Sequence, residues 1–197
     1  MEIIPCVTLK NYKIINNSIS VTNISEYIKE EEILYILDLD GIEKGKLNLC
    51  TFQKLSSKYQ LWIDCGPRNI GDVVDIFMAG ATSITVRRTL NPSFSISDIR
   101  DISDSKVYLK IDFKDYKNYS DDDLFLKDYD GIVNFNNKEE IEQDFKFGEY
   151  LNKITMQNKI YYFEDNPKNN SYWERFGATG LLVDINKFKG FKNGLRK

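Results

Sequence analysis

Short apolar runs recur at regular intervals along the chain, and most of them are separated by segments whose apolar residues follow a helical period. The runs have the length of buried strands, which span about 4–8 residues. We predict strands over residues 3–9, 33–40, 61–64, 83–88, 107–113, 131–135, 160–163 and 180–185. Strands that alternate with helices pair in parallel, because a parallel connection needs a long crossover.

The segments between the strands carry signals for helices. Asn69 followed by Asp72 is typical of a helix N-terminus, and the apolar residues between 73 and 78 form one helical stripe. Residues 138–154 form a second amphipathic pattern, in which Gly148 is an interruption. Shorter helices are predicted over residues 25–32 and 95–103, and residues 119–130 leave room for about one or two helical turns.

Eight parallel strands with intervening helices predict a closed (β/α)8 barrel. The chain of 197 residues is close to the lower size limit of that fold, which is about 200 residues. The main rival is an open doubly wound sheet, which needs a glycine-rich phosphate loop after its first strand. That position reads TLKNYK, residues 8–13, so we favour the barrel and expect it to form one domain over residues 1–197.

The composition argues against two classes of partner. An apolar fraction of 42% is ample for a buried core, whereas a net charge of −3 and a pI near 5.2 argue against a nucleic-acid-binding face. No apolar segment reaches the length of about 18 residues that spans a membrane, so we expect no membrane partner. Residues 187–197 form the one cationic run, which we interpret as a solvated terminus.

The cysteines and the missing histidines limit the chemistry further. Cys6, Cys50 and Cys65 are odd in number and unevenly spaced, so they predict no disulfide framework and fit a reducing cytoplasm. The chain has no histidine, which excludes histidine triads, imidazole bases and histidine–zinc sites. Acid–base chemistry must therefore use carboxylates, lysine, tyrosine, cysteine or threonine. We expect no cofactor and assign no metal ligand.

Five motifs occur in the order and spacing of a known family. They are IIPCVTLKNYKII (3–15), YILDLDGIEKGKLN (35–48), WIDCGPR (62–68), AGATSITVRRTL (79–90) and VYLKIDFKD (107–115). Together they resemble the histidine-biosynthesis barrel family, which includes ProFAR isomerase and the cyclase subunit of imidazole glycerol phosphate synthase. Within it, the chain is most similar to archaeal proteins related to ProFAR isomerase. The resemblance implies a barrel of the ribulose-phosphate-binding type that acts on a small phosphorylated metabolite.

The departures from the family pattern concern the catalytic pair. In the isomerase, two carboxylates at the ends of strands one and five serve as general base and general acid. Asp112 occupies the second position here, but Thr8 occupies the first. Because a threonine hydroxyl does not accept a proton near neutral pH as a carboxylate does, we do not expect a true ProFAR isomerase.

The resemblance also implies two phosphate sites, each built after a pair of strands. The second pair carries Glu164 and Asp184, which would repel a phosphate dianion. The first pair still offers a flexible turn and cations, so we expect one phosphate site at most. Its candidate residues are Gly66, Arg68, Arg87, Arg88 and Thr89.

Barrel chemistry takes place where the carboxyl ends of the strands meet. The polar residues that we collect at these ends are Thr8, Lys10, Asp38, Asp40, Asp64, Arg87, Asp112, Glu164 and Asp184. So many carboxylates on one rim would repel one another unless their charge is neutralised. A divalent cation, a cationic substrate group or interleaved lysine and arginine could neutralise it. Alternatively, several of them point outward or cap the following helix. Our candidate catalytic residues are Asp112, Asp40, Asp64 and Thr8.

Two further motifs resemble a phosphate-binding loop and a nucleophilic cysteine, but neither has the residues that this chemistry needs. GIEKGK (41–46) is one residue short of a phosphate-loop motif, and Leu47 replaces its serine or threonine. Cys65 beside Asp64 has no histidine to activate it, and the carboxylate would raise its thiol pKa.

Two hypotheses follow. The first is an isomerase, lyase or synthase acting on a small phosphorylated metabolite, with Asp112 as acid–base residue and Asp40 or Asp64 as its partner. The second is a catalytically degenerate barrel that serves as a binding or structural partner. The oligomeric state does not follow from the sequence.

Overall fold

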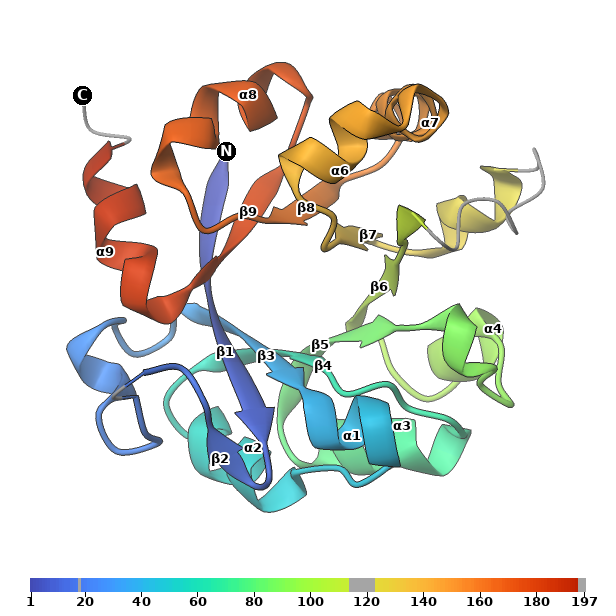
Figure 1. Cartoon of the computed structure of the whole chain (residues 1–197). Helices are drawn as coiled ribbons and strands as arrows, with labels where there is room; N and C mark the ends of the chain where they lie inside the picture. Colours follow the sequence, from blue (N-terminus) through green and yellow to red (C-terminus); the bar gives the residue numbers. More distant parts are fainter. Residues whose placement is uncertain (18, 114–122, 195–197) are drawn as a thin grey trace.

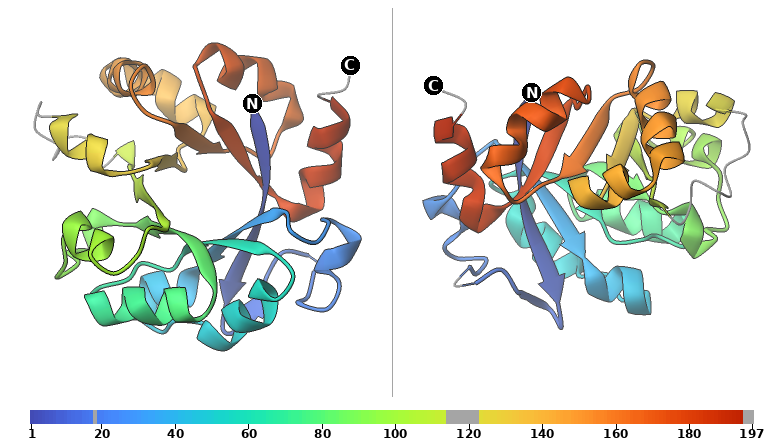
Figure 2. Two further views of the ribbon diagram at one scale, coloured as in Figure 1. Left: turned by 180° about the vertical axis from the view of Figure 1, so that it is seen from behind. Right: turned by 45° about the horizontal axis from the view of Figure 1, so that its top comes forward.

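The computed structural model describes residues 1–17, 19–113 and 123–194. In this part of the chain, eight parallel strands close into a barrel in the order β1-β3-β4-β5-β6-β7-β8-β9, and β9 pairs back with β1 (Figures 1 and 2). The strands are β1 (Glu2–Lys10), β3 (Ile33–Asp38), β4 (Gln60–Asp64), β5 (Ala81–Val86), β6 (Lys106–Lys110), β7 (Gly131–Asn134), β8 (Ile160–Phe163) and β9 (Gly180–Asp184). The predicted barrel is therefore confirmed.

Helices and 3-10 turns surround the barrel, those of the first half below it and most of those of the second half above it in Figure 1. The helices are α1 (Leu39–Lys44), α2 (Leu49–Ser56), α3 (Ile70–Met78), α4 (Ile96–Arg100), α6 (Lys138–Gln143), α7 (Phe145–Thr155), α8 (Asn170–Arg175) and α9 (Ile185–Gly194). The 3-10 turns are η1 (Ile24–Glu26), η2 (Arg88–Leu90), η3 (Asp123–Asp128) and η4 (Pro167–Asn169).

Some predicted element boundaries were wrong. The strand predicted over residues 33–40 ends at Asp38, because the Asp38 side chain accepts the Asp40 and Gly41 N–H groups and starts α1. The predicted helix over 25–32 is only the short turn η1. The long pattern over 138–154 is two helices that meet at Asp144, not at Gly148. Of the segment 119–130, residues 119–122 lie outside the described residues, and the remainder contains η3.

A short hairpin extends the first strand at the rim of the barrel. β2 (Lys13–Ile14) pairs antiparallel with the end of β1, and the two-residue turn between them has φ of 50° at Asn11 and 61° at Tyr12. Two positive φ values in succession are the geometry of a tight hairpin turn, which asparagine tolerates far better than tyrosine. The contacts that hold this turn are part of the rim described below.

The interior of the barrel is a packed aromatic core. Side chains alternate between the two faces of each strand, and the inner face carries Tyr35, Trp62, Tyr108 and Tyr161 among smaller apolar residues. The Trp62 ring lies 3.9 Å from Tyr108 and 4.9 Å from Tyr161, centroid to centroid. Two further apolar clusters fill the space between barrel and helices, one largely in each half of the chain. Side chains fill the interior, so the barrel leaves no room for a ligand inside it.

Candidate active site at the barrel mouth

The alternation of side chains decides which strand ends face the mouth. Trp62 and Tyr108 point into the barrel, so Asp64, Lys110 and Asp112, which follow at intervals of two residues, share their inner face. Asp38 and Glu164 have the opposite parity and point toward the helices. The acidic rim expected from the sequence therefore divides into an inner and an outer set.

Lys110 and Asp112 form an ion pair at the end of β6. The Lys110 ammonium contacts Oδ2 of Asp112. Lys110 is only 6% exposed, whereas the Asp112 side chain is 32% exposed. A cation on the protein side and an accessible carboxylate on the solvent side form an arrangement suited to proton transfer at a bound ligand.

Asp112 also borders a pocket of about 540 Å³ between the ends of β6 and β7 and the start of α6 and α7. Phe135 and Asn136 form the β7 side of this pocket, and Glu140 and Asp144 add two further carboxylates. The pocket thus brings the predicted acid–base residue next to a space large enough for a small metabolite.

Sequence reasoning did not single out Lys110. The available signal was a lysine inside the apolar run VYLKIDF, two residues before Asp112 and therefore on the same face of the strand. A buried lysine is uncommon unless it is paired, so its position in a predicted barrel strand could have marked it.

Asp64 is held in a bidentate ion pair with Arg87 from the neighbouring strand. Arg87 Nε lies 2.7 Å from Asp64 Oδ1 and Nη2 lies 2.6 Å from Oδ2, which also accepts the Tyr35 hydroxyl at 2.8 Å. Asp64 is fully buried. Burial lowers the pKa of Arg87, but the Asp64 carboxylate outweighs this effect and raises that pKa above its usual value. These contacts give Asp64 a positioning role at the mouth, and its predicted catalytic role stays a prediction.

Asp40 connects the β1–β2 hairpin to α1. Its carboxylate accepts the Tyr12 backbone N–H at 3.0 Å, the Asn48 amide at 3.3 Å and the Lys44 ammonium at 3.0 Å. The N–H of Tyr12 and the Lys44 ammonium together hold the pKa of Asp40 well below its usual range. Asp40 therefore stabilises the left-handed turn at Tyr12, and a role in proton transfer stays a prediction.

This geometry predicts a pH-dependent effect of Asp40→Asn. The folded pKa of Asp40 is depressed, so its contribution to stability is present above the unfolded carboxyl pKa of about 3.9 and is lost as pH falls below that value. We expect Asp40→Asn to lower the unfolding midpoint at neutral pH and to match the wild type at the acid end. Urea unfolding between neutral and acid pH measures this difference. Asp75→Asn on the exposed side of α3 is the control, and an equal pH dependence in both variants would contradict the assignment.

Thr8 and Asp184 are joined at the other side of the mouth through Asn16. The Asn16 Oδ1 accepts the Thr8 backbone N–H at 2.6 Å, and its Nδ2 donates to Asp184 Oδ2 at 2.6 Å. Below them lies the buried Cys6 thiol, whose pKa is raised by burial and by the charges of Asp184 and Asp64. Asn16 was not predicted, because it comes from the loop after the hairpin and meets Asp184 only across the closure of the barrel.

The outer carboxylates hold structure in place: Asp38 is the N-cap of α1, which was one of the two readings open from the sequence, and Glu164 ties the loop after β8 to α8. Asp38 accepts backbone N–H groups of α1 and both the backbone and side-chain N–H of Asn48. Glu164 accepts the Trp173 indole N–H at 2.7 Å and the Asn169 amide at 2.9 Å. Both carboxylates thus hold loops and helices in place.

The five residues proposed for a phosphate site do not form one cluster. Gly66 has a φ of 63°, and Arg68 donates from Nη1 to the Gly66 carbonyl at 3.0 Å and from Nη2 to the Ile42 carbonyl at 2.9 Å. The Arg68 guanidinium therefore closes the turn after β4 onto α1. Arg87 is directed into the barrel instead, toward Asp64. Arg68 and Arg87 thus bind groups of the protein itself and do not converge on one site, and phosphate binding by these residues stays a prediction.

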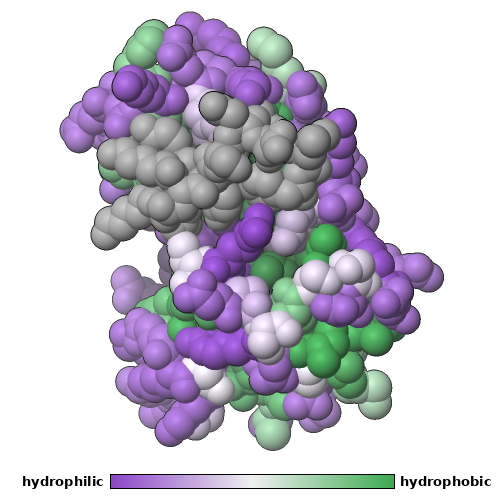
Figure 3. Space-filling model, turned by 90° about the vertical axis from the view of Figure 1, so that its right-hand side faces the viewer, coloured by the Kyte–Doolittle hydropathy of each residue, from purple (hydrophilic) through white to green (hydrophobic). Residues whose placement is uncertain are grey.

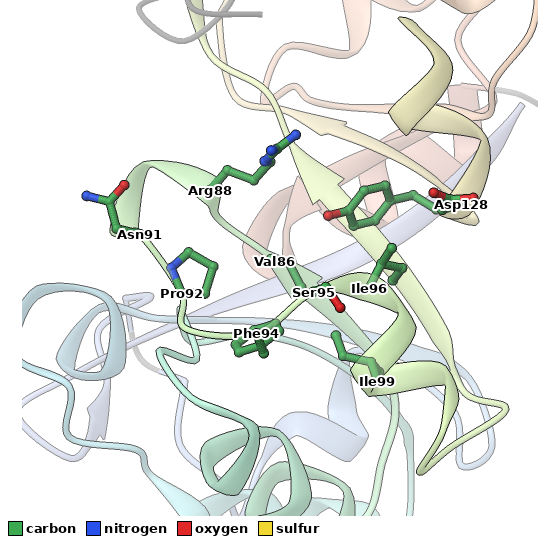
Figure 4. Close-up of a pocket in the computed structure, with 10 residues that line it drawn as sticks. Val86, Arg88, Asn91, Pro92, Phe94, Ser95, Ile96, Ile99 and Asp128 are labelled. Atoms are coloured by element: carbon green, nitrogen blue, oxygen red, sulfur yellow. The ribbon is translucent and has the colours of Figure 1, made fainter.

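Arg88 and Thr89 are exposed in η2, outside the mouth. Arg88 lines a separate pocket of about 440 Å³, whose wall comes from the segment before α4 and from Ile96 and Ile99 of α4 (Figure 4). On this side of the molecule, apolar surface in the lower right of Figure 3 is bordered by hydrophilic residues. This second pocket is amphipathic and contains none of the mouth residues described above.

Within residues 1–17, 19–113 and 123–194, no three cysteine or carboxylate side chains are placed to hold a metal ion. In the same part of the chain, no helix has the length and apolar character needed to cross a membrane.

Comparison with known proteins supports the architecture. The chain is similar to a crystal structure of 3-hexulose-6-phosphate synthase, with a TM-score of 0.64 and 11% sequence identity over 98% of this chain and 99% of that one. At this identity the likeness shows the fold alone. The sequence matches no known protein family and no curated protein. The chain is thus a (β/α)8 barrel, and the link to histidine-biosynthesis barrels stays a prediction.

Proposed function

We propose that this barrel is an enzyme that moves a proton next to the carbonyl group of a small phosphorylated metabolite, as an isomerase or as a lyase or synthase. The observation that carries the proposal is the Lys110–Asp112 pair beside the pocket at the carboxyl ends of β6 and β7. Chemistry in barrels of this kind sits at that end of the strands.

The two side chains have complementary tasks. Asp112, the more exposed partner, accepts a proton from the carbon next to the substrate carbonyl. Lys110, beside it, stabilises the negative charge that develops on the carbonyl oxygen. Return of the proton to the neighbouring carbon completes an isomerisation, whereas addition of the enolate to an aldehyde forms a carbon–carbon bond. The ion pair with Asp64 holds the Arg87 side chain in place beside this site. The Arg87 guanidinium lies over the Phe135 ring, 5.9 Å from its centroid.

The charges around the pocket orient the substrate. Glu140 and Asp144 line the Asp112 pocket and disfavour a phosphate dianion there. We therefore place the carbonyl end of the substrate at Asp112 and its phosphate on the side of the mouth that follows β5, where Arg87 supplies positive charge. The resemblance of the fold to 3-hexulose-6-phosphate synthase supports a choice of phosphorylated ketoses as first substrates to test.

Isotope exchange tests the proposal without knowledge of the full reaction. The protein is incubated in D2O with dihydroxyacetone phosphate or 3-hexulose-6-phosphate, and proton NMR follows the signal of the C–H next to the carbonyl. We expect exchange at least roughly a hundredfold faster than without protein, the lower range of acid–base catalysis. Background exchange with both compounds would contradict proton transfer on phosphorylated ketoses.

A second candidate function is a catalytically degenerate barrel that acts as a binding or structural partner. It is favoured by Thr8 in place of a carboxylate and by the structural use of Asp38, which caps α1, and of Glu164, which binds the Trp173 indole N–H. Thermal-shift measurements separate the two candidates, because a specific ligand raises the unfolding midpoint by mass action. A degenerate barrel predicts no shift with phosphorylated ketoses, whereas the enzyme predicts one that grows with ligand concentration.

A further inference from the structure

Lys110 is buried at the end of β6, although a lysine could stabilise charge on a ligand from a more exposed position. A lysine has a long, flexible chain and usually leaves its ammonium in water, because burying a charge is unfavourable unless it is paired. Here the side chain stays inside the mouth, and its nitrogen meets a carboxylate that itself borders the pocket. On the inner face, Tyr108 precedes Lys110 along β6, and Val133 of β7 lies beside it in the strand register.

Within the proposed function, we infer that Lys110 is a nucleophile that forms a covalent imine with the carbonyl carbon of the substrate. Desolvation is a known way to make a lysine amine nucleophilic, and the Asp112 carboxylate, although it stabilises the ammonium, supplies the group that can accept its proton. The ligand class is then an aldehyde or ketone, and not a carboxylate or an alcohol. Asp112 becomes the group that carries protons between the amine, the departing water and the substrate.

The step balances without any further reactant. Asp112 takes a proton from the Lys110 ammonium, and the free amine forms a C–N bond to the carbonyl carbon. A proton then moves from this nitrogen to the former carbonyl oxygen, which gives the carbinolamine. Asp112 returns its proton to the hydroxyl group, the C–O bond breaks and water leaves. The products are a protonated imine and the Asp112 carboxylate, which is ready to accept a proton from the adjacent carbon.

A second lysine–aspartate pair in the protein provides a matched comparison. Lys44 contacts Asp40 at 3.0 Å, but the Lys44 side chain is 43% exposed and lies on the outer side of the rim on α1. If proximity to a carboxylate were sufficient, both lysines would react alike. If position at the mouth decides, only Lys110 forms the imine.

Borohydride trapping tests the inference. The wild type is incubated separately with dihydroxyacetone phosphate, glycolaldehyde and pyruvate, then reduced with sodium borohydride and measured by intact-mass spectrometry and peptide mapping. We expect about one adduct per chain on the peptide that contains Lys110, with at least one of the three compounds. Lys110→Arg keeps the positive charge and should lose roughly tenfold or more of the adduct, whereas Lys44→Arg should retain it.

The outcomes separate this inference from the proposed function. No adduct on Lys110 with any of the three compounds, or equal labelling of Lys110 and the surface lysines, overturns the imine. The peptide map of the wild type gives this answer even if Lys110→Arg fails to fold. Isotope exchange without trapping leaves proton transfer standing and removes the imine. An adduct on Lys110 without isotope exchange supports the nucleophile and removes the proposed reaction.

Discussion

Replacement of Arg87 by methionine is expected to lower the free energy of unfolding by about 3–5 kcal/mol, because it leaves a buried charge without its partner. Asp64 is fully buried, and both of its oxygens accept hydrogen bonds from the Arg87 guanidinium. Methionine fills a similar volume but donates no hydrogen bond. Only the Tyr35 hydroxyl would remain for Asp64. Guanidinium chloride unfolding followed by circular dichroism measures the change.

The double variant Asp64→Leu with Arg87→Met is the control for this prediction. Removing both charges also removes the unpaired carboxylate, so the double variant should be more stable than Arg87→Met alone. A deficit of Arg87→Met below about 1 kcal/mol, typical of a surface pair, would contradict the assigned burial and geometry.

The second large effect concerns turnover. Asp112→Asn is expected to reduce the isotope-exchange rate by about 10²–10⁴-fold, the usual contribution of a positioned acid–base group. The asparagine amide keeps the size of the side chain but accepts no proton from carbon near neutral pH. The midpoint of thermal unfolding should also fall, because the buried Lys110 ammonium loses its carboxylate partner, so exchange rates are compared well below the midpoints of both proteins.

Asp165→Asn is the matched control for Asp112→Asn. Asp165 is a carboxylate on the same end of the barrel and pairs with Lys187 at 2.6 Å, with both side chains about half exposed. The substitution changes the net charge of the rim by the same amount without touching the Asp112 pocket. We expect wild-type exchange in this variant, and an equal loss in both would mean that rim charge alone accounts for the effect.

The barrel could be predicted because each strand is a local pattern. Apolar runs of strand length, separated by helical periods, allow few topologies, and the run VYLKIDF carries Asp112 next to its last residue. The same alternation that placed Asp112 at the mouth also placed Lys110 there. Each strand of the barrel, and the position of Asp112 at a strand end, can therefore be recognised from a local pattern of about ten residues.

The roles of the other carboxylates could not be read in this way. Asp38 and Asp40 are two residues apart, and a strand that continues to residue 40 would place both on one face. The Asp38 cap ends the strand first, so Asp40 turns toward the hairpin instead. The contact between Asn16 and Asp184 joins the two ends of the barrel, and only closure of the sheet creates it.

The residues predicted for a phosphate site do not converge for a related reason, and their role stays a prediction. Arg68, Arg87 and Arg88 follow two neighbouring strands, which suggested a common anion site. A guanidinium has five N–H donors and reaches several groups of the protein itself, as Arg68 does with two backbone carbonyls. Sequence position alone does not show whether an arginine keeps those donors for a ligand.

The claim that Lys110 and Asp112 act together on the substrate is tested most directly by isotope-exchange rates in Lys110→Met, Asp112→Asn and the variant that carries both. Residues that act as a unit give strongly non-additive losses. We therefore predict that the double variant is slower than Asp112→Asn by no more than about threefold. A double variant whose loss is the product of the two single losses, or an Asp112→Asn rate equal to that of the wild type, would contradict the account.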